Sequence, residues 1–101
     1  MGSIDKTYVS NRLRAAKRGT AQALYDLGLL YATGQGVRQD FVAAHMWFNL
    51  AAMKGIRRAR INRAEVAQDM SEVEIAEAQR QAREWQHNYF NGTRQAVGGR
   101  R

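Results

Sequence analysis

Apolar side chains recur every three or four residues along most of this chain, which is the period of an amphipathic α-helix. In the last long segment, Ile75, Ala78, Ala82, Trp85 and Tyr89 form one such stripe. Glycines and capping residues divide the pattern, so it predicts five helices, over about residues 5–18, 20–32, 41–54, 57–68 and 72–90. The sequence therefore predicts an all-α protein.

Turn and cap residues mark the ends of these helices. The segment Gly34-Gln35-Gly36 ends the second helix, and its glycines free the backbone for positive φ. The Val37 side chain is expected to pack into the end of the helical hairpin, and Asp40 is expected to start the next helix as its N-cap. Ser71 and Glu74 have the spacing of a capping box, which places the start of the last helix.

The second predicted helix is apolar on almost every face. Only Thr20, Gln22 and Asp26 carry polar side chains beside its leucines, alanines and tyrosines. A helix of this kind must be covered on several sides. Gly28 and Ala32 are one turn apart and lack bulk, so we expect another helix to approach closely there.

A short pattern repeats at an offset of 36 residues. Ala15-Ala16-Lys17-Arg18-Gly19 recurs as Ala51-Ala52-Met53-Lys54-Gly55, and Ala23 recurs as Ala59. Both glycines follow a predicted helix, at the position that takes a left-handed turn. A unit of this length corresponds to two short helices with their turns, and stacked units of this kind form an α-solenoid.

Residues of the second and third predicted helices resemble the Sel1-like repeat, an α-solenoid family related to the tetratricopeptide repeat. The motif positions, in order and at the family's spacing, are Ala23, Leu27, Gly28, Tyr31, Gly34, Gly36, Val37, Asp40, Ala44, Trp47, Phe48, Ala51, Ala52 and Gly55. The resemblance covers one full repeat, at about residues 20–55. It implies structural roles for these residues, with Trp47 and Phe48 as large core side chains and Ala51 and Ala52 keeping the helices close.

The flanking segments are similar to parts of further repeats. Residues 5–19 look like the closing helix of a preceding, degenerate repeat, and residues 56–68 look like the opening helix of a following one. The remainder is similar to the long closing helix of bacterial members, which favours a bacterial source. We thus expect a helical repeat domain over residues 4–90, after an expression-derived segment at 1–3 and before a disordered basic tail at 91–101.

Composition excludes several kinds of chemistry. The chain has no Cys, which rules out disulfides, thiolate zinc sites, iron–sulfur clusters and a cysteine nucleophile. His45 and His87 are distant in sequence and neither is followed by a His, Cys or carboxylate at i+3 or i+4, and no Ser-His-Asp arrangement is apparent. Gly34-Gln35-Gly36 follows a helix rather than a strand and lacks the Lys-Ser/Thr of a phosphate loop. We therefore expect no catalytic residue, no metal and no cofactor.

Charge is divided along the chain. The net charge is +7, but residues 1–63 carry +8, residues 64–93 carry −4, and residues 94–101 add three arginines. The densest basic cluster is Arg57, Arg58, Arg60 and Arg63. Arg63 lies on the apolar stripe of the fourth helix, so we expect it to pair, half-buried, with a carboxylate of the fifth. The divided charge suits an acidic partner or head-to-tail association of copies.

Together these features predict a non-catalytic adaptor or scaffold module that binds another protein. The candidate contacts are Gln22, Leu24, Asp26, Arg57, Arg58 and Arg60, where Leu24 replaces a residue that is commonly polar in the family. Fewer than three repeats are present, so either the last helix caps the stack or the chain forms a homo-oligomer. The alternative is binding of nucleic acid or another polyanion through Arg57, Arg58 and Arg60. No apolar run reaches the roughly 18 residues of a membrane span, and both the cytoplasm and the periplasm stay open.

Overall fold

Five α-helices and a terminal π-helical turn make up the computed structural model, which describes residues 5–91. The elements are α1 (Lys6–Lys17), α2 (Ala21–Thr33), α3 (Phe41–Met53), α4 (Arg57–Ala67), α5 (Glu72–Trp85) and the π-turn η1 (Gln86–Asn91). No strand occurs in this part of the chain, so the all-α prediction is confirmed. The predictions for residues 1–3 and 92–101 lie outside the described residues.

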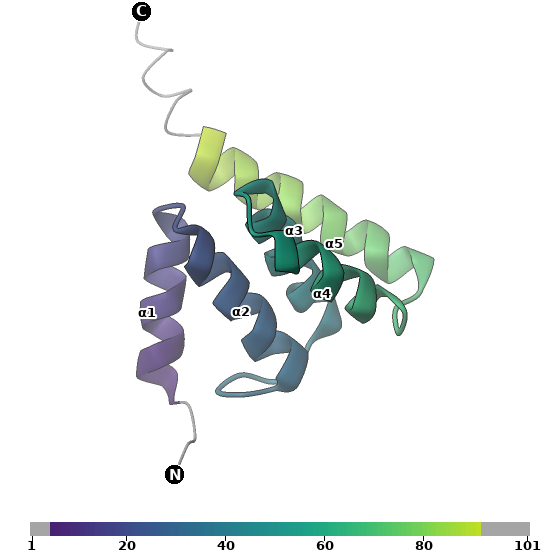
Figure 1. The fold of residues 1–101 in the computed structure, drawn as a ribbon, viewed down its shortest axis with the longest axis horizontal. Coiled ribbons are helices and arrows are strands. Elements are labelled where there is room, and N and C mark those ends of the chain that lie inside the picture. The colour runs from purple at the N-terminus through teal and green to yellow at the C-terminus, as the bar shows by residue number, and fades with distance from the viewer. Residues whose placement is uncertain (1–4, 92–101) are drawn as a thin grey trace, which may run out of the picture.

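Each helix from α1 to α4 packs against the next as an antiparallel hairpin, whereas α5 packs on α3 and runs along it toward the turn between α1 and α2 (Figure 1). Helix ends follow the local chemistry of the sequence. Asp40 accepts a hydrogen bond from the Ala43 backbone amide, and Ser71 and Glu74 form the predicted capping box. Gly34 ends α2 with a φ of 74°, a left-handed conformation that a side chain would strain.

The core lies where α2 packs against α3. Its fully or nearly fully buried side chains come from both helices, and they include Leu24, Leu27, Leu30, Ala44, Trp47, Phe48, Leu50 and Ala51. A side chain at Gly28 would overlap the Phe48 ring, because α3 approaches α2 directly at that glycine. The expected close approach at Gly28 and the core roles of Trp47 and Phe48 are thus confirmed.

Aromatic contacts attach the last helix to the repeat. The rings of Trp47 and Trp85 meet edge to face with centroids 4.7 Å apart, and the Trp85 and Tyr89 rings lie 4.2 Å apart. The Lys54 ammonium lies over the ring of Phe90 in η1, 4.4 Å from the ring centre. The C-terminal segment therefore returns to the turns at the ends of α1 and α3.

Arg63 has a different partner from the one predicted. It is half-buried, but its Nη1 donates to Asn49 Oδ1 of α3 at 2.6 Å and it forms no ion pair with α5. The prediction was wrong because α4 packs on α3 rather than along α5. The α5 carboxylates Glu77 and Glu84 are instead bound by Arg80.

His45 is also more buried than is usual for histidine, which mostly lies half-buried or at the surface. It is only 4% exposed, and its Nδ1 has no hydrogen-bond partner among the described residues. Burial lowers the pKa of the His45 imidazole, and the nearby Arg63 guanidinium lowers it further. His45 is therefore a neutral core side chain at neutral pH.

Candidate functional site

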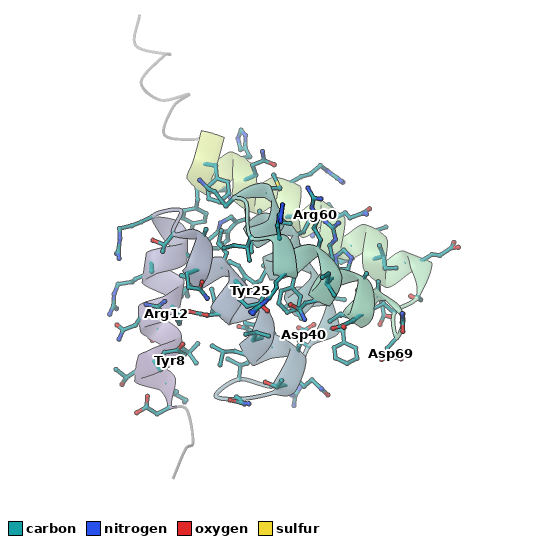
Figure 2. The ribbon with its side chains drawn as sticks, viewed as in Figure 1. Tyr8, Arg12, Tyr25, Asp40, Arg60 and Asp69 are labelled. Atoms are coloured by element: carbon teal, nitrogen blue, oxygen red, sulfur yellow. The ribbon has the colours of Figure 1, made fainter. Side chains whose placement is uncertain are left out.

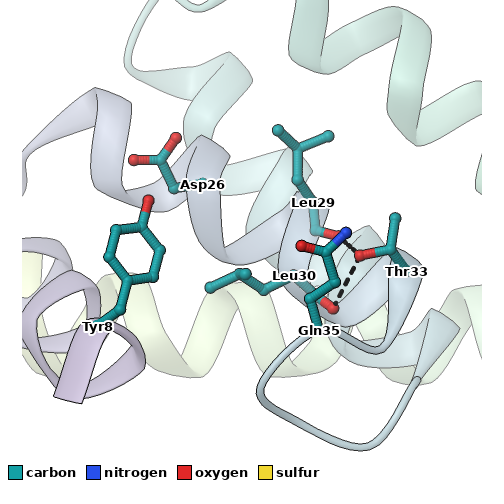
Figure 3. Close-up of a pocket in the computed structure, with 6 residues that line it drawn as sticks. All are labelled: Tyr8, Asp26, Leu29, Leu30, Thr33 and Gln35. Carbon is teal, nitrogen blue, oxygen red and sulfur yellow. Dashed lines mark hydrogen bonds between the residues drawn. The ribbon is translucent and has the colours of Figure 1, made fainter. Parts of the chain in front are cut away.

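A groove of about 290 Å³ lies between α1 and α2. Tyr8 of α1 forms one side of it, and the other side comes from α2 and from Gln35 in the turn after α2. The lining residues are Tyr8, Asp26, Leu29, Leu30, Thr33 and Gln35. Figure 3 shows Tyr8 across the groove from Leu29 and Gln35, with Leu30 pointing into the space between them. The groove follows one exposed stripe of an otherwise buried helix.

The groove has apolar walls and a fixed carboxylate. Tyr8 is 40% exposed and Leu29 is 37% exposed, so both present apolar surface to solvent. Asp26 accepts hydrogen bonds from Arg12 Nη1 at 3.1 Å and from Gln22 Nε2 at 2.9 Å, which hold its side chain in place. Such a combination of apolar surface and one oriented acceptor suits recognition of a protein segment.

A second surface gathers positive charge at the turn between α1 and α2 and the turn between α3 and α4. We call it the basic edge, and it consists of Lys17, Arg18, Lys54, Arg57, Arg58 and Arg60. The two turns are adjacent, because the Lys54 ammonium lies against Gly19. Figure 2 places Arg60 toward one end of α4 and Asp69 beyond the other, so charge changes sign along this helix.

The basic edge contains a hollow of about 250 Å³. It is lined by Ala52, Gly55, Ile56, Arg57 and Arg60. Arg57 and Arg60 are three residues apart and so face the same side of α4. The hollow therefore brings two guanidinium groups next to a small apolar wall.

The candidate contacts predicted from the sequence fall on these two surfaces, with one exception. Asp26 lines the groove, and Gln22 donates a hydrogen bond to the Asp26 carboxylate. Arg57 and Arg60 line the hollow, and Arg58, which lies between them in sequence, is exposed. The prediction of Leu24 as a contact residue was wrong, because its side chain is 0% exposed. It lies in the core on the side of α2 that meets α3, where a polar residue would be costly to bury.

Sequence reasoning found only Asp26 of the groove residues and missed Tyr8, Leu29, Leu30, Thr33 and Gln35. Leu29 and Thr33 follow Gln22 and Asp26 at helical spacing, so the sequence of α2 already placed them on the same face as these two polar residues. Tyr8 could be found by the internal repeat, because it is offset by 36 residues from the small, fully buried Ala44. A large side chain at a position that is small in the other copy marks a difference in packing.

Two other kinds of site are absent from the described residues. Within residues 5–91 no group of three or more His, Asp or Glu side chains is arranged to hold a metal ion. In the same range, no helix has both the length and the apolar character needed to cross a bilayer.

Comparison with protein families identifies the repeat. Residues 21–56 match the family model of the Sel1 repeat, a span that holds α2, α3 and the turn between them. The chain therefore contains a Sel1 repeat, and the resemblance indicated by its motif residues is confirmed over this span. Sel1 repeats are helical modules that generally bind other proteins and are generally not catalytic. Comparison with curated proteins gives no match.

Proposed function

We propose that this protein is a non-catalytic adaptor or scaffold module that binds a segment of another protein in the groove between α1 and α2. The observation that carries the proposal is the exposed stripe of α2, where Leu29 faces Tyr8 across the groove and Asp26 is held by Arg12 and Gln22. Exposed apolar side chains that face each other across a concave surface, beside one oriented polar group, suit the docking of a partner's side chain.

Rigidity of α2 supports the same proposal. Its other faces are buried against α1 and α3, and Gly34 and Asp40 fix the turn that follows it. A partner that binds the exposed stripe therefore meets a surface that is already ordered, which lowers the entropy cost of association.

A comparative capture experiment tests the proposal. The wild-type chain, Leu29→Glu and the matched control Gln79→Glu are immobilised and exposed to extract from the source organism. Both substitutions place a new carboxylate on an exposed helical position. We expect a protein that is retained by the wild type and by Gln79→Glu and is lost with Leu29→Glu. Equal retention by all three would refute the groove as the binding surface.

Binding of nucleic acid or another polyanion through Arg57, Arg58 and Arg60 stays a prediction. The observation in its favour is that these side chains form no ion pair within residues 5–91. Electrostatic binding of a duplex falls by orders of magnitude between about 50 and 200 mM salt. A titration of labelled duplex at the lower salt, with no binding, would remove this alternative.

A further inference from the structure

The six cations of the basic edge have no carboxylate partner in the described part of the chain. The ion pairs of that part join Arg12 to Asp26 and Arg80 to Glu77 and Glu84, all outside the basic edge. Other carboxylates accept hydrogen bonds from backbone amides at the start of their own helices, as Asp5, Asp40 and Glu74 do. The positive charge of the edge is thus uncompensated and open to an external anion.

The hollow in this edge has a shape and a chemistry that suit a carboxylate. The planar guanidinium groups of Arg57 and Arg60 present paired donors, which match carboxylate oxygens. Gly55 leaves the backbone open, since nothing lies within 4 Å of the place where a side chain would begin. An acidic side chain can therefore approach both arginines without meeting an obstacle there.

Apolar surface adjoins the same hollow. Ala52 and Ile56 form part of its wall. Met53, which follows Ala52 in sequence and is the last residue of α3, does not line the hollow but is 49% exposed. Methionine is flexible and polarisable, so it adapts to varied apolar partners. A ligand that fills this surface needs apolar side chains next to its carboxylates.

Two other occupants fit these observations less well. Single-stranded nucleic acid is usually held by bases stacked on free aromatic rings, but the rings beside this edge, Tyr89 and Phe90, already carry Lys17 and Lys54 near their faces. A second copy of the chain carries a net charge of +7 and is repelled overall, and in its acidic region Glu77 and Glu84 are already bound by Arg80.

We infer that the basic edge docks an acidic segment of a partner protein, one in which Asp or Glu stands next to apolar residues. This inference rests on the proposed function as an interaction module, and it adds a second contact surface with its own partner chemistry. The carboxylate binds Arg57 and Arg60 in the hollow, while a neighbouring apolar side chain packs on Ile56 and Met53. Lys17, Arg18 and Lys54 extend the attraction along the edge.

Selection from a random peptide library tests this inference without knowledge of the natural partner. The full chain is the bait, compared with the double variant Arg57→Glu/Arg60→Glu and the control Arg14→Glu/Arg83→Glu, which has the same net charge and changes exposed arginines elsewhere. Circular dichroism confirms that each bait is folded. We expect the wild type and the control to enrich peptides with Asp or Glu beside apolar residues, and the edge variant to enrich them about tenfold less. Equal enrichment by the edge variant, or selected peptides without acidic residues, would overturn the inference.

Direct binding measurements separate the other occupants. A selected peptide and a labelled single-stranded DNA of equal charge are titrated by fluorescence anisotropy, and sedimentation reports self-association. We expect the peptide to bind more tightly than the DNA and the chain to stay monomeric. Tighter DNA binding that depends on Arg57 and Arg60, or dimers abolished by the edge variant, would overturn the choice of a protein segment. Leu29→Glu leaves the basic edge intact, so failure of the groove and failure of the edge give different results.

Discussion

The ring of Phe48 in α3 occupies the space that a side chain on Gly28 of α2 would need. A Cβ atom built at Gly28 falls well inside van der Waals contact with the ring carbons. Phe48 is almost completely buried, and Tyr25 packs on its ring with centroids 5.7 Å apart, so the ring has no room to retreat. The closest approach of the two repeat helices therefore depends on a residue without a side chain.

We predict that Gly28→Ala destabilises the protein despite the higher helix propensity of alanine. The propensity gain is about 1 kcal/mol, whereas overpacking a tight core costs about 1 to 3 kcal/mol and further displaces α3. Urea unfolding followed by circular dichroism should show a lower midpoint. Gln22→Ala, on the exposed side of the same helix, should leave the midpoint nearly unchanged. Adding Phe48→Leu to Gly28→Ala should recover part of the loss, and strict additivity of the two changes would contradict the clash.

Much of this fold follows from local sequence features. Asp40, Ser71 and Gly34 each impose a helix boundary through their own side chain or lack of one, so these three predicted boundaries agree with the structure to within a residue or two. The last helix was predicted to end at residue 90, but α5 ends at Trp85 and the chain continues as the π-turn η1. The burial of Trp47 and Phe48 follows equally from their size and spacing. The caps and the left-handed glycine act within one turn of the chain and need no knowledge of the tertiary arrangement.

The site depends on packing that local patterns do not encode. Tyr8 and Leu29 line the same groove only because α1 and α2 pack together at one particular rotation about their axes. The same is true of Leu24, which faces the core although its place in the motif is commonly polar. Arg63 finds Asn49 instead of a carboxylate because α4 lies on α3. Pairings of this kind are set by which helices become neighbours.

Tyr25 joins α2 to α4 through one hydrogen bond. Its hydroxyl donates to Asn62 Oδ1 at 2.7 Å, and the tyrosine is largely buried. We predict that Tyr25→Phe lowers the free energy of unfolding by about 1 kcal/mol, because Asn62 loses a partner in a partly dry contact. Thermal unfolding by calorimetry measures the change. A double-mutant cycle with Asn62→Ala should give a coupling energy clearly above zero, and its absence would mean that the bond does not stabilise the fold.

The capping box at the start of α5 supports the helix that covers α3. Ser71 accepts from the Glu74 amide at 3.1 Å and its own amide donates to Glu74 Oε1 at 2.8 Å. We predict that Ser71→Ala costs about 1 kcal/mol of stability, since the Glu74 backbone amide loses its acceptor, the Ser71 hydroxyl oxygen. Ser71→Asp should keep most of the stability because aspartate is also a good N-cap. Equal unfolding midpoints for the alanine and wild-type chains would show that α5 is held by its packing alone.

His45 should make stability depend on pH in a defined window. Its folded-state pKa lies below the ordinary value of 6.5, because burial disfavours the charged imidazolium and Arg63 adds repulsion. The unfolded chain therefore binds more protons than the folded chain once the pH falls below about 6.5. Stability is complete above that pH and declines as the pH drops toward the folded-state pKa, with a slope of at most about 1.4 kcal/mol per pH unit for one proton.

A comparison of variants isolates this contribution. The pKa of Glu77 is lowered to about 2 by hydrogen bonds from Arg80 and then Gln81, so its own effect on stability appears only below its ordinary value of 4.5. Between pH 5 and 6.5 the slope of stability against pH should therefore be reduced by His45→Gln and kept by His87→Gln, which changes an exposed histidine. Urea midpoints measured across this window give both slopes. An unchanged slope in His45→Gln would show that the buried imidazole does not control the acid sensitivity of the fold.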